Sequence, residues 1–252
     1  MSVTASVMPG AEPFELGPAD AQVGCVLVHG FTGSPSEIRP IGEHLAAAGV
    51  RCYAPLLPGH GTNLDDMEAS TAADWLEGAR AAVVQARAVH PRLFVLGFSM
   101  GGLLAINLSL EVRLEGLIVV STPLVLHDPK AKFMPILSLF RRYEPPRPPV
   151  RETGAPAGRQ GVAYDQKPLV SIKRMMRLMK ATVAALPRVE APLLAVYGAF
   201  DRRATIADGQ QVLSSVASAS KRLEVLPNSR HLCMFGPDAD LLLNTIEGFV
   251  TA

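Results

Sequence analysis

Residues 93–102 read Leu-Phe-Val-Leu-Gly-Phe-Ser-Met-Gly-Gly, and the fold that we expect depends on this stretch. Its first four residues are apolar and typical of a strand buried in a parallel sheet, whereas the apolar residues after it suit a helix. Between them, Gly97–Gly101 fits the G-x-S-x-G pattern of a nucleophile elbow. Glycines two places before and after Ser99 leave the backbone room to double back. The stretch therefore predicts a strand, a sharp turn and a helix, with the Ser99 hydroxyl exposed at the carboxyl end of the strand.

The alternative is that Ser99 is an ordinary turn residue, because serine is common in glycine-rich turns. The pattern by itself is weak. An elbow also requires a strand before the serine and a helix after it, and the sequence predicts both. We therefore take Ser99 as the candidate nucleophile.

Apolar runs alternate with helical patterns on both sides of this stretch. Besides the elbow strand and its helix, strands are expected at residues 24–28, up to residue 54, and at residues 117–121, 193–197 and 223–226, with helices at residues 38–48, 71–89, 206–216 and 237–250. This alternation predicts an α/β fold with a mostly parallel central sheet that helices flank on both faces. A ligand site is then expected at the carboxyl ends of the strands.

Residues 124–187 interrupt this alternation. They show no strand pattern, and Pro145–Pro149 is incompatible with regular structure. The segment holds twelve Lys and Arg against four Asp and Glu, a formal charge of +8 in a chain that carries +1. Its second half has apolar residues at helical spacing. We interpret it as a small helical lid inserted into a core of residues 1–123 and 188–252; the alternative for its charges is an ordinary solvated face.

The composition narrows the class of protein further. The chain has 252 residues, of which 48% are hydrophobic and 19% charged, as in a globular enzyme. A net charge near zero gives no reason to expect a nucleic-acid partner. No apolar run reaches the ~18 residues of a membrane span, and the first ten residues do not form a secretion signal. Three cysteines form neither a disulfide framework nor a metal-ligand pattern, so we expect no metal or cofactor, a cytoplasmic location, and a monomer or homodimer.

A nucleophilic serine needs a base that takes its proton and a third group that orients the base. In the order serine, acid, histidine, the base must follow Ser99, and His231 is the only histidine after His127. It lies in a predicted loop before the last helix, where it could reach Ser99. Asp201 follows the strand at 193–197 and is the candidate acid. The rivals Asp208 and Asp238 are expected at helix starts, where aspartate commonly caps.

The carbonyl oxygen of a substrate becomes negative during such a reaction and needs fixed hydrogen-bond donors. The backbone N–H of Met100, next to the nucleophile, is one candidate. The backbone N–H of Phe31 is the other, because Gly30 and Gly33 allow that loop to approach the site. His29 and His60 are expected to brace their loops rather than to act as bases.

These motifs together resemble the α/β-hydrolases, and among them small bacterial carboxylesterases and monoacylglycerol lipases. The similar segments are Val26–Ser36, Leu57–Gly61, Leu96–Gly102 and Ser229–His231. The resemblance implies an α/β-hydrolase fold with a small helical lid, a nucleophile at Ser99, an acid at Asp201, a base at His231, and oxyanion donors at Phe31 and Met100. It also implies a small-molecule ester as the substrate.

Arg202, Arg203 and Arg230 depart from that family's pattern and place positive charge beside the candidate acid and base. From the motifs and the resemblance we expect a hydrolase of short- or medium-chain carboxylic esters, with monoacylglycerols as one candidate, although this positive charge counts against neutral glycerides. Thioesters, lactones, carbon–carbon bonds and acyl transfer are alternatives on the same residues, and a binding protein without catalysis is a further alternative. The basic lid suggests weak contact with a lipid surface. Substrate binding is assigned to apolar residues of the lid and the loop, namely Phe31, Met134, Leu137, Met175 and Met176.

Overall fold

The protein is described here from a computed structural model that covers residues 6–128, 134–137, 140–144 and 161–252. At residues 134 and 135 only the backbone is described.

The described chain builds its fold on one seven-stranded sheet with the strand order β1-β3-β2-β4-β5-β6-β7. All neighbouring strands are parallel except β1, which pairs antiparallel with β3 at one edge. The prediction of a mostly parallel sheet is therefore confirmed. The strands are β1 (Phe14–Leu16), β2 (Val23–Val28), β3 (Arg51–Ala54), β4 (Arg92–Phe98), β5 (Gly116–Val120), β6 (Leu193–Gly198) and β7 (Lys221–Leu226).

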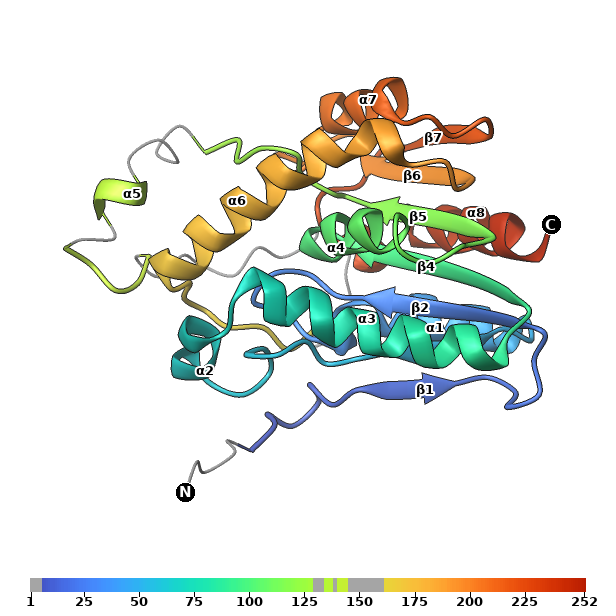
Figure 1. Cartoon of the computed structure of the whole chain (residues 1–252), viewed down its shortest axis with the longest axis horizontal. Coiled ribbons are helices and arrows are strands. Elements are labelled where there is room, and N and C mark those ends of the chain that lie inside the picture. Colours follow the sequence, from blue (N-terminus) through green and yellow to red (C-terminus); the bar gives the residue numbers. More distant parts are fainter. Residues whose placement is uncertain (1–5, 129–133, 138–139, 145–160) are drawn as a thin grey trace.

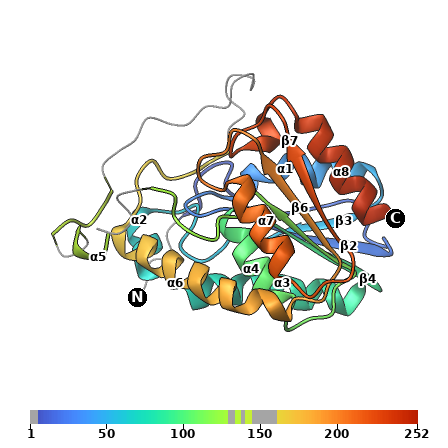
Figure 2. The same ribbon diagram turned by 90° about the horizontal axis from the view of Figure 1, so that it is seen from above.

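Helices cover both faces of the sheet, as Figure 2 shows. One face carries α1 (Arg39–Ala47) and α8 (Ala239–Thr251). The other face carries α3 (Ala72–Val89), α4 (Met100–Leu108), α6 (Leu169–Ala185) and α7 (Ile206–Ser215). The short helices are α2 (Leu64–Ala69), α5 (Met134–Leu137) and the 3-10 helices η1 (Pro35–Glu37), η3 (Leu186–Arg188) and η4 (Cys233–Phe235).

Two apolar clusters hold the layers together, and β4 contributes to both. Leu93 and Val95 pack with residues of α3 and α4, whereas Phe94, Leu96 and Phe98 pack with residues of α1 and α8. Successive side chains of a strand point to opposite faces of the sheet, so a strand covered on both faces must be apolar throughout. This requirement explains the continuous apolar run before the elbow.

The sequence did not indicate β1 or α2. β1 spans three residues at the edge of the sheet, and only Phe14 among them is buried. It is a strand because it pairs with β3, and the residues of β1 alone contain no pattern that predicts this pairing. α2 begins after Asn63, whose side chain accepts the backbone N–H of Asp66 at 2.9 Å. It is too short to produce a helical repeat in the sequence.

The helix expected in the second half of residues 124–187 is found as α6, and it packs on α4 (Figure 1). Met175, Leu178 and Met179 of α6 belong to the same cluster as the buried residues of α4. Near its beginning, the Ser171 hydroxyl donates to the Met67 carbonyl at 3.0 Å. The beginning of α6 and α5 lie on the side of the molecule toward which β2, β4 and β5 point (Figure 1). This side holds the candidate site.

Candidate active site

Ser99 occupies a sharp turn between β4 and α4. Its backbone has φ 53° and ψ −118°, a conformation that L residues rarely adopt, and its N–H donates to the Val120 carbonyl at 2.9 Å. A Cβ atom at Gly97 would lie 2.2 Å from the Gly101 carbonyl oxygen, and one at Gly101 would lie 2.0 Å from that of Val28. Both positions therefore require glycine. The strand, turn and helix predicted around Ser99 are all present.

His231 lies in the loop between β7 and η4, and its ring reaches Ser99. The Nε2 atom of His231 is 3.1 Å from the Ser99 hydroxyl oxygen, and its Nδ1 atom is 2.8 Å from Oδ2 of Asp201. The side chain is buried and packs on Phe98, with 5.2 Å between the ring centroids. Three residues that are far apart in the sequence thus form one chain of hydrogen bonds at the carboxyl ends of β4 and β6.

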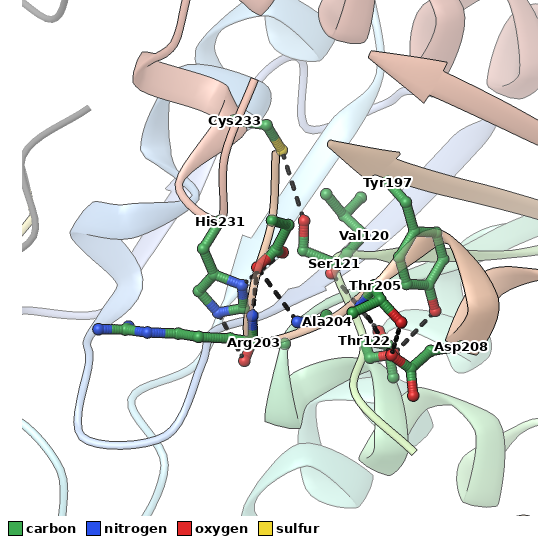
Figure 3. A network of polar contacts seen from close by, with 12 residues as sticks. Val120, Ser121, Thr122, Tyr197, Arg203, Ala204, Thr205, Asp208, His231 and Cys233 are labelled. Atoms are coloured by element: carbon green, nitrogen blue, oxygen red, sulfur yellow. Dashed lines mark hydrogen bonds and ion pairs between the residues drawn. The ribbon is translucent and has the colours of Figure 1, made fainter. Parts of the chain in front are cut away.

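Asp201 follows β6 and is held by the backbone after it. Its Oδ1 atom accepts the N–H of Arg203 at 2.7 Å and that of Ala204 at 3.1 Å, which leaves Oδ2 for His231. Figure 3 shows Arg203 and Ala204 beside His231. Burial raises the pKa of Asp201, but the charge of His231 and the hydrogen bonds outweigh burial, so that the pKa is lowered. The carboxyl group is therefore ionised at neutral pH.

Asp208, a rival for the acid, fastens the beginning of α7 instead. Its Oδ2 atom accepts the backbone N–H of Thr205 at 2.7 Å and lies 2.7 Å from Nε2 of His127, while its Oδ1 atom accepts the N–H of Leu124 at 3.0 Å. Figure 3 shows Asp208 beside Thr205. The expected helix-capping role is confirmed for Asp208.

For Asp238 the expected capping role is wrong. It occupies the N-cap position of α8, but its side chain makes no capping hydrogen bond there. Instead it accepts the N–H of Asn228 at 2.7 Å and the hydroxyl of Ser229 at 2.8 Å. The loop before His231 turns back toward α8, and its inward donors need an acceptor that the helix terminus supplies.

The loop after β2 carries Phe31, and α4 begins at Met100. His29 braces this loop as expected, since its Nδ1 atom lies 3.0 Å from the Gly30 carbonyl and its Nε2 atom accepts the N–H of Leu57 at 3.1 Å. Nδ1 of His60 lies 3.1 Å from the Pro58 carbonyl. Burial lowers the pKa of His29, with the nearby His60 adding to the effect, and burial lowers the pKa of His60 to about 4. Both rings are neutral at pH 7.

The residues assigned to substrate binding do not lie together: some pack against a small apolar cluster, one lies in the main core, and one is exposed. The half-buried Phe31 ring lies 5.8 Å from that of Trp75, and Phe31 and Met176 both pack against a small apolar cluster. Met175 belongs to the main core, and Leu137 is 37% exposed on α5. The side chain of Met134 lies outside the described residues. The small cluster consists of Leu169 and Ile172, with Leu126 also packed against it.

Sequence reasoning did not assign this cluster to the site, although Leu169 and Ile172 lie in the apolar stripe that predicted α6. A stripe on a helix shows which face is buried, but not what that face contacts. Only the tertiary structure shows that it meets the loop of Phe31.

Comparison with known proteins identifies the class. The family described as serine aminopeptidase, S33, matches residues 19–238, and the chain belongs to this family. Among solved structures, a lipolytic enzyme from a report on the metagenome-derived enzymes LipS and LipT superposes with a TM-score of 0.85 at 29% identity, covering 98% of this chain and 99% of the other. A monoacylglycerol lipase from Paleococcus ferrophilus superposes with a TM-score of 0.79 at 16% identity, covering 95% and 98%.

Curated relatives define the class more narrowly. The chain is 30% identical over 251 residues to a thermostable monoacylglycerol lipase from Bacillus sp. (strain H-257), covering 96% of this chain and 95% of the relative. It is 20% identical over 240 residues to a carboxylesterase from Bacillus subtilis (strain 168), covering 95% and 96%. The protein has an α/β-hydrolase fold and is an ester-cleaving serine hydrolase of the esterase and monoacylglycerol lipase type. The resemblance stated from the motifs is confirmed.

Among the described helices, none combines the length and the apolar character needed to cross a membrane. The cytoplasmic location and the monomeric or homodimeric state expected from the sequence stay predictions.

Proposed function

We propose that Ser99, His231 and Asp201 are the nucleophile, base and acid of this hydrolase. The proposal rests on the continuous hydrogen-bond chain between them, with 3.1 Å from serine to histidine and 2.8 Å from histidine to aspartate. His231 takes the Ser99 proton while the serine oxygen attacks the ester carbonyl. The ionised Asp201 holds the ring by Nδ1 and stabilises the imidazolium that forms.

The negative oxygen of the tetrahedral intermediate needs donors, and we assign the backbone N–H groups of Phe31 and Met100 to this role. Met100 is the first residue of α4, where N–H groups have no partner within the helix. His231 then gives its proton to the leaving alkoxide. Water is activated by the same ring and releases the acyl group from Ser99.

The substrates that we propose are short- or medium-chain carboxylic esters, with monoacylglycerols among them. The name of the relative from Bacillus sp. (strain H-257) supports the glyceride, and the apolar surroundings of Phe31 support an acyl chain. Residues 124–187 would act as a lid on a core of residues 1–123 and 188–252. The acyl pocket would draw on Phe31 and on the methionine and leucine side chains of that lid, namely Met134, Leu137, Met175 and Met176.

The test combines covalent labelling with turnover. A fluorophosphonate should label the wild-type protein at Ser99 and should leave folded Ser99→Ala unlabelled. Ser99→Ala should also lower kcat on p-nitrophenyl esters by roughly 10³-fold or more. Ester turnover at a near-normal rate in Ser99→Ala would refute the assignment, and folded wild-type protein that takes no label would favour a binding protein.

A substrate panel separates the reactions that the same residues could perform. We expect higher kcat/KM on short- and medium-chain carboxylic esters than on thioesters and lactones of the same acyl group. Higher kcat/KM on thioesters or lactones, or transfer of the acyl group to an added alcohol in preference to water, would replace the esterase assignment.

We also propose weak contact with anionic lipid surfaces through the basic lid, at α5 and at residues 140–141. Three large apolar side chains are exposed there, at Ile136 (58%), Leu137 (37%) and Phe140 (80%), and the neighbouring Arg141 is exposed as well. Apolar and basic side chains side by side are typical of interfacial binding. Co-sedimentation with phosphatidylglycerol vesicles should fall in Phe140→Ser and remain in the control Val84→Ser, an exposed valine on α3. Equal sedimentation of both variants would refute the contact.

A further inference from the structure

Glu37, the last residue of η1, has its carboxyl group buried inside the loop that carries Phe31. Its side chain is only 8% exposed, and Oε2 accepts the backbone N–H of Gly30 at 3.2 Å. A Cβ atom at Gly33 would lie 2.0 Å from Oε2 and 2.2 Å from Cδ. The loop residues on both sides of Phe31 therefore wrap around this carboxyl group, and the absence of a side chain at position 33 makes room for it.

The peptide group that carries the Phe31 N–H is fixed through its carbonyl. The Gly30 oxygen lies 3.0 Å from Nδ1 of His29 and accepts the N–H of Gly33 at 3.3 Å. A peptide group is planar, so holding its carbonyl also fixes the direction of its N–H. Glu37 holds the next peptide group back along the chain, through the Gly30 N–H. Without that acceptor, a buried N–H would be left without a partner in the peptide group directly before the one that carries the Phe31 N–H.

Residues 161–164 fasten the same region from the side of the lid segment. The Val162 carbonyl accepts the Ser34 hydroxyl at 2.7 Å, and the Tyr164 N–H donates to the Thr32 carbonyl at 2.9 Å. These bonds hold the loop after Phe31, whereas Glu37 holds it before Phe31 through the Gly30 N–H and His29 holds it there through the Gly30 carbonyl. The two sets of contacts act on different peptide groups.

We propose that Glu37 is a positioning residue for ester hydrolysis: its carboxyl oxygen holds the Gly30 N–H and so aims the Phe31 N–H at the oxygen of the tetrahedral intermediate. This inference rests on the proposed function, in which Phe31 is an oxyanion donor. The donor is needed most in the transition state, so misplacing it lowers kcat and leaves KM nearly unchanged. An amide oxygen can accept the same N–H, so glutamine replaces glutamate in this role.

Glu37→Ala, Glu37→Gln and Gly33→Ala test the role, with Glu43→Ala on the exposed side of α1 as the control. Loss of one oxyanion donor costs roughly 10²–10³ in kcat, so Glu37→Ala should lower kcat by about 10-fold or more with KM within about two-fold. Glu37→Gln and Glu43→Ala should keep at least about half of the wild-type kcat, since each retains the Gly30 contact. The affinity for a boronic acid, which forms a tetrahedral adduct on Ser99, should fall in parallel with kcat.

Gly33→Ala tests the same contact without changing Glu37. The new Cβ would occupy the position of the carboxyl group, so kcat should fall in the wild-type background. In Glu37→Ala the space is empty, and adding Gly33→Ala should lower kcat no further. Additive losses in the double variant would overturn the proposal, because they would show that Gly33 acts independently of Glu37.

The remaining outcomes separate this role from the proposed function. If Ser99→Ala is inactive while Glu37→Ala keeps the wild-type kcat, only the role of Glu37 is refuted. If Glu37→Gln loses as much kcat as Glu37→Ala, the hydrogen-bond role is refuted as well, because the amide retains the acceptor. If Ser99→Ala remains active, the proposed function itself fails. If Glu37→Ala does not fold, the kcat and the boronic-acid affinity of the other two variants decide the question. The role is supported if Glu37→Gln keeps both while Gly33→Ala loses both, and it is refuted by any other result.

Discussion

Phe200 donates its backbone N–H to the carbonyl of Ser229 at 3.0 Å, and this bond joins the loop of Asp201 to the loop of His231. The two loops follow adjacent parallel strands, β6 and β7. A Cβ atom at Gly198, at the end of β6, would lie 2.5 Å from the Ser229 carbonyl oxygen, so the loops touch along their backbones. The distance between the proposed acid and base is therefore set by main-chain contacts and not by the two side chains alone.

Asp238 is expected to support catalysis without contacting the substrate. Asp238→Ala removes the acceptor of the Asn228 N–H and of the Ser229 hydroxyl; the Ser229 hydroxyl is buried, and a buried donor left without a partner costs about 1–3 kcal/mol. We expect a lower free energy of unfolding in urea and a lower kcat, because the His231 loop loses its support. Asp238→Asn keeps one acceptor oxygen, so its free energy of unfolding and its kcat should fall less than those of Asp238→Ala. Wild-type stability and kcat in Asp238→Ala would contradict this interpretation.

Asp201→Asn should lower kcat by roughly 10⁴-fold, because an amide cannot stabilise the imidazolium and favours the wrong tautomer of the ring. The N–H groups of Arg203 and Ala204 still find an oxygen acceptor in asparagine, so the protein should remain folded. Stopped-flow or steady-state rates on a p-nitrophenyl ester measure the loss, and circular dichroism checks the fold. The exposed Asp240 on α8 provides a control in Asp240→Asn. A loss of less than about ten-fold would argue that another group is the acid.

Ser99→Gly should be more stable than Ser99→Ala, although both should be inactive. The backbone at Ser99 has φ 53°, which costs on the order of 1 kcal/mol or more for a residue with a Cβ and nothing for glycine. Thermal unfolding of the two variants side by side measures the difference. The higher Tm in Ser99→Ala would show that the turn stores no such strain.

Glu37 should make stability depend on pH near neutrality. Burial raises the pKa of its carboxyl group from 4.5 to about 7, against the opposing effects of the Gly30 N–H and the charges of Arg203 and Lys167. Because the folded-state pKa is above the unfolded one, this stabilisation is fully present below pH 4.5 and is lost as the pH rises through 7. The difference between the folded and unfolded pKa values corresponds to a change of about 3 kcal/mol in the free energy of unfolding.

Glu37→Gln removes that titration. The free energy of unfolding of Glu37→Gln minus that of wild type, measured in urea, should therefore be higher at pH 8.5 than at pH 4.5 by about 3 kcal/mol. Glu43→Gln, on an exposed side chain, should show no such change between the two pH values. An equal difference between Glu37→Gln and wild type at both pH values would mean that the carboxyl group is not held protonated by the fold.

Local patterns predicted the elements that are long, apolar and covered on both faces. β2, β4, β5 and β6 contain mostly apolar residues because the core takes their side chains on both sides. β1 was not predicted, since three residues at an edge are held by pairing with β3. The same limit applied to Asp238: its place at a helix start is visible in the sequence, but its partners in the His231 loop are not.

In the candidate site, too, local sequence patterns predicted some residues, whereas others depend on contacts between distant segments. Ser99 could be found because an elbow needs glycines at fixed distances, and His231 because few histidines follow the serine. Glu37 carries no such signal. A glutamate beside a helix start is typically a solvated residue, and nothing local shows that the loop closes around it.

The sequence by itself determined the alternation of strands and helices and the elbow, since each depends on residues near one another along the chain, and it named Ser99, Asp201 and His231 as candidates from their order. Only the tertiary structure decided that Ser99, Asp201 and His231 meet, that α6 packs on α4, and that the carboxyl group of Glu37 is buried beside Phe31. These are contacts between segments far apart in sequence, and they arise when the sheet aligns the carboxyl ends of its strands at one edge.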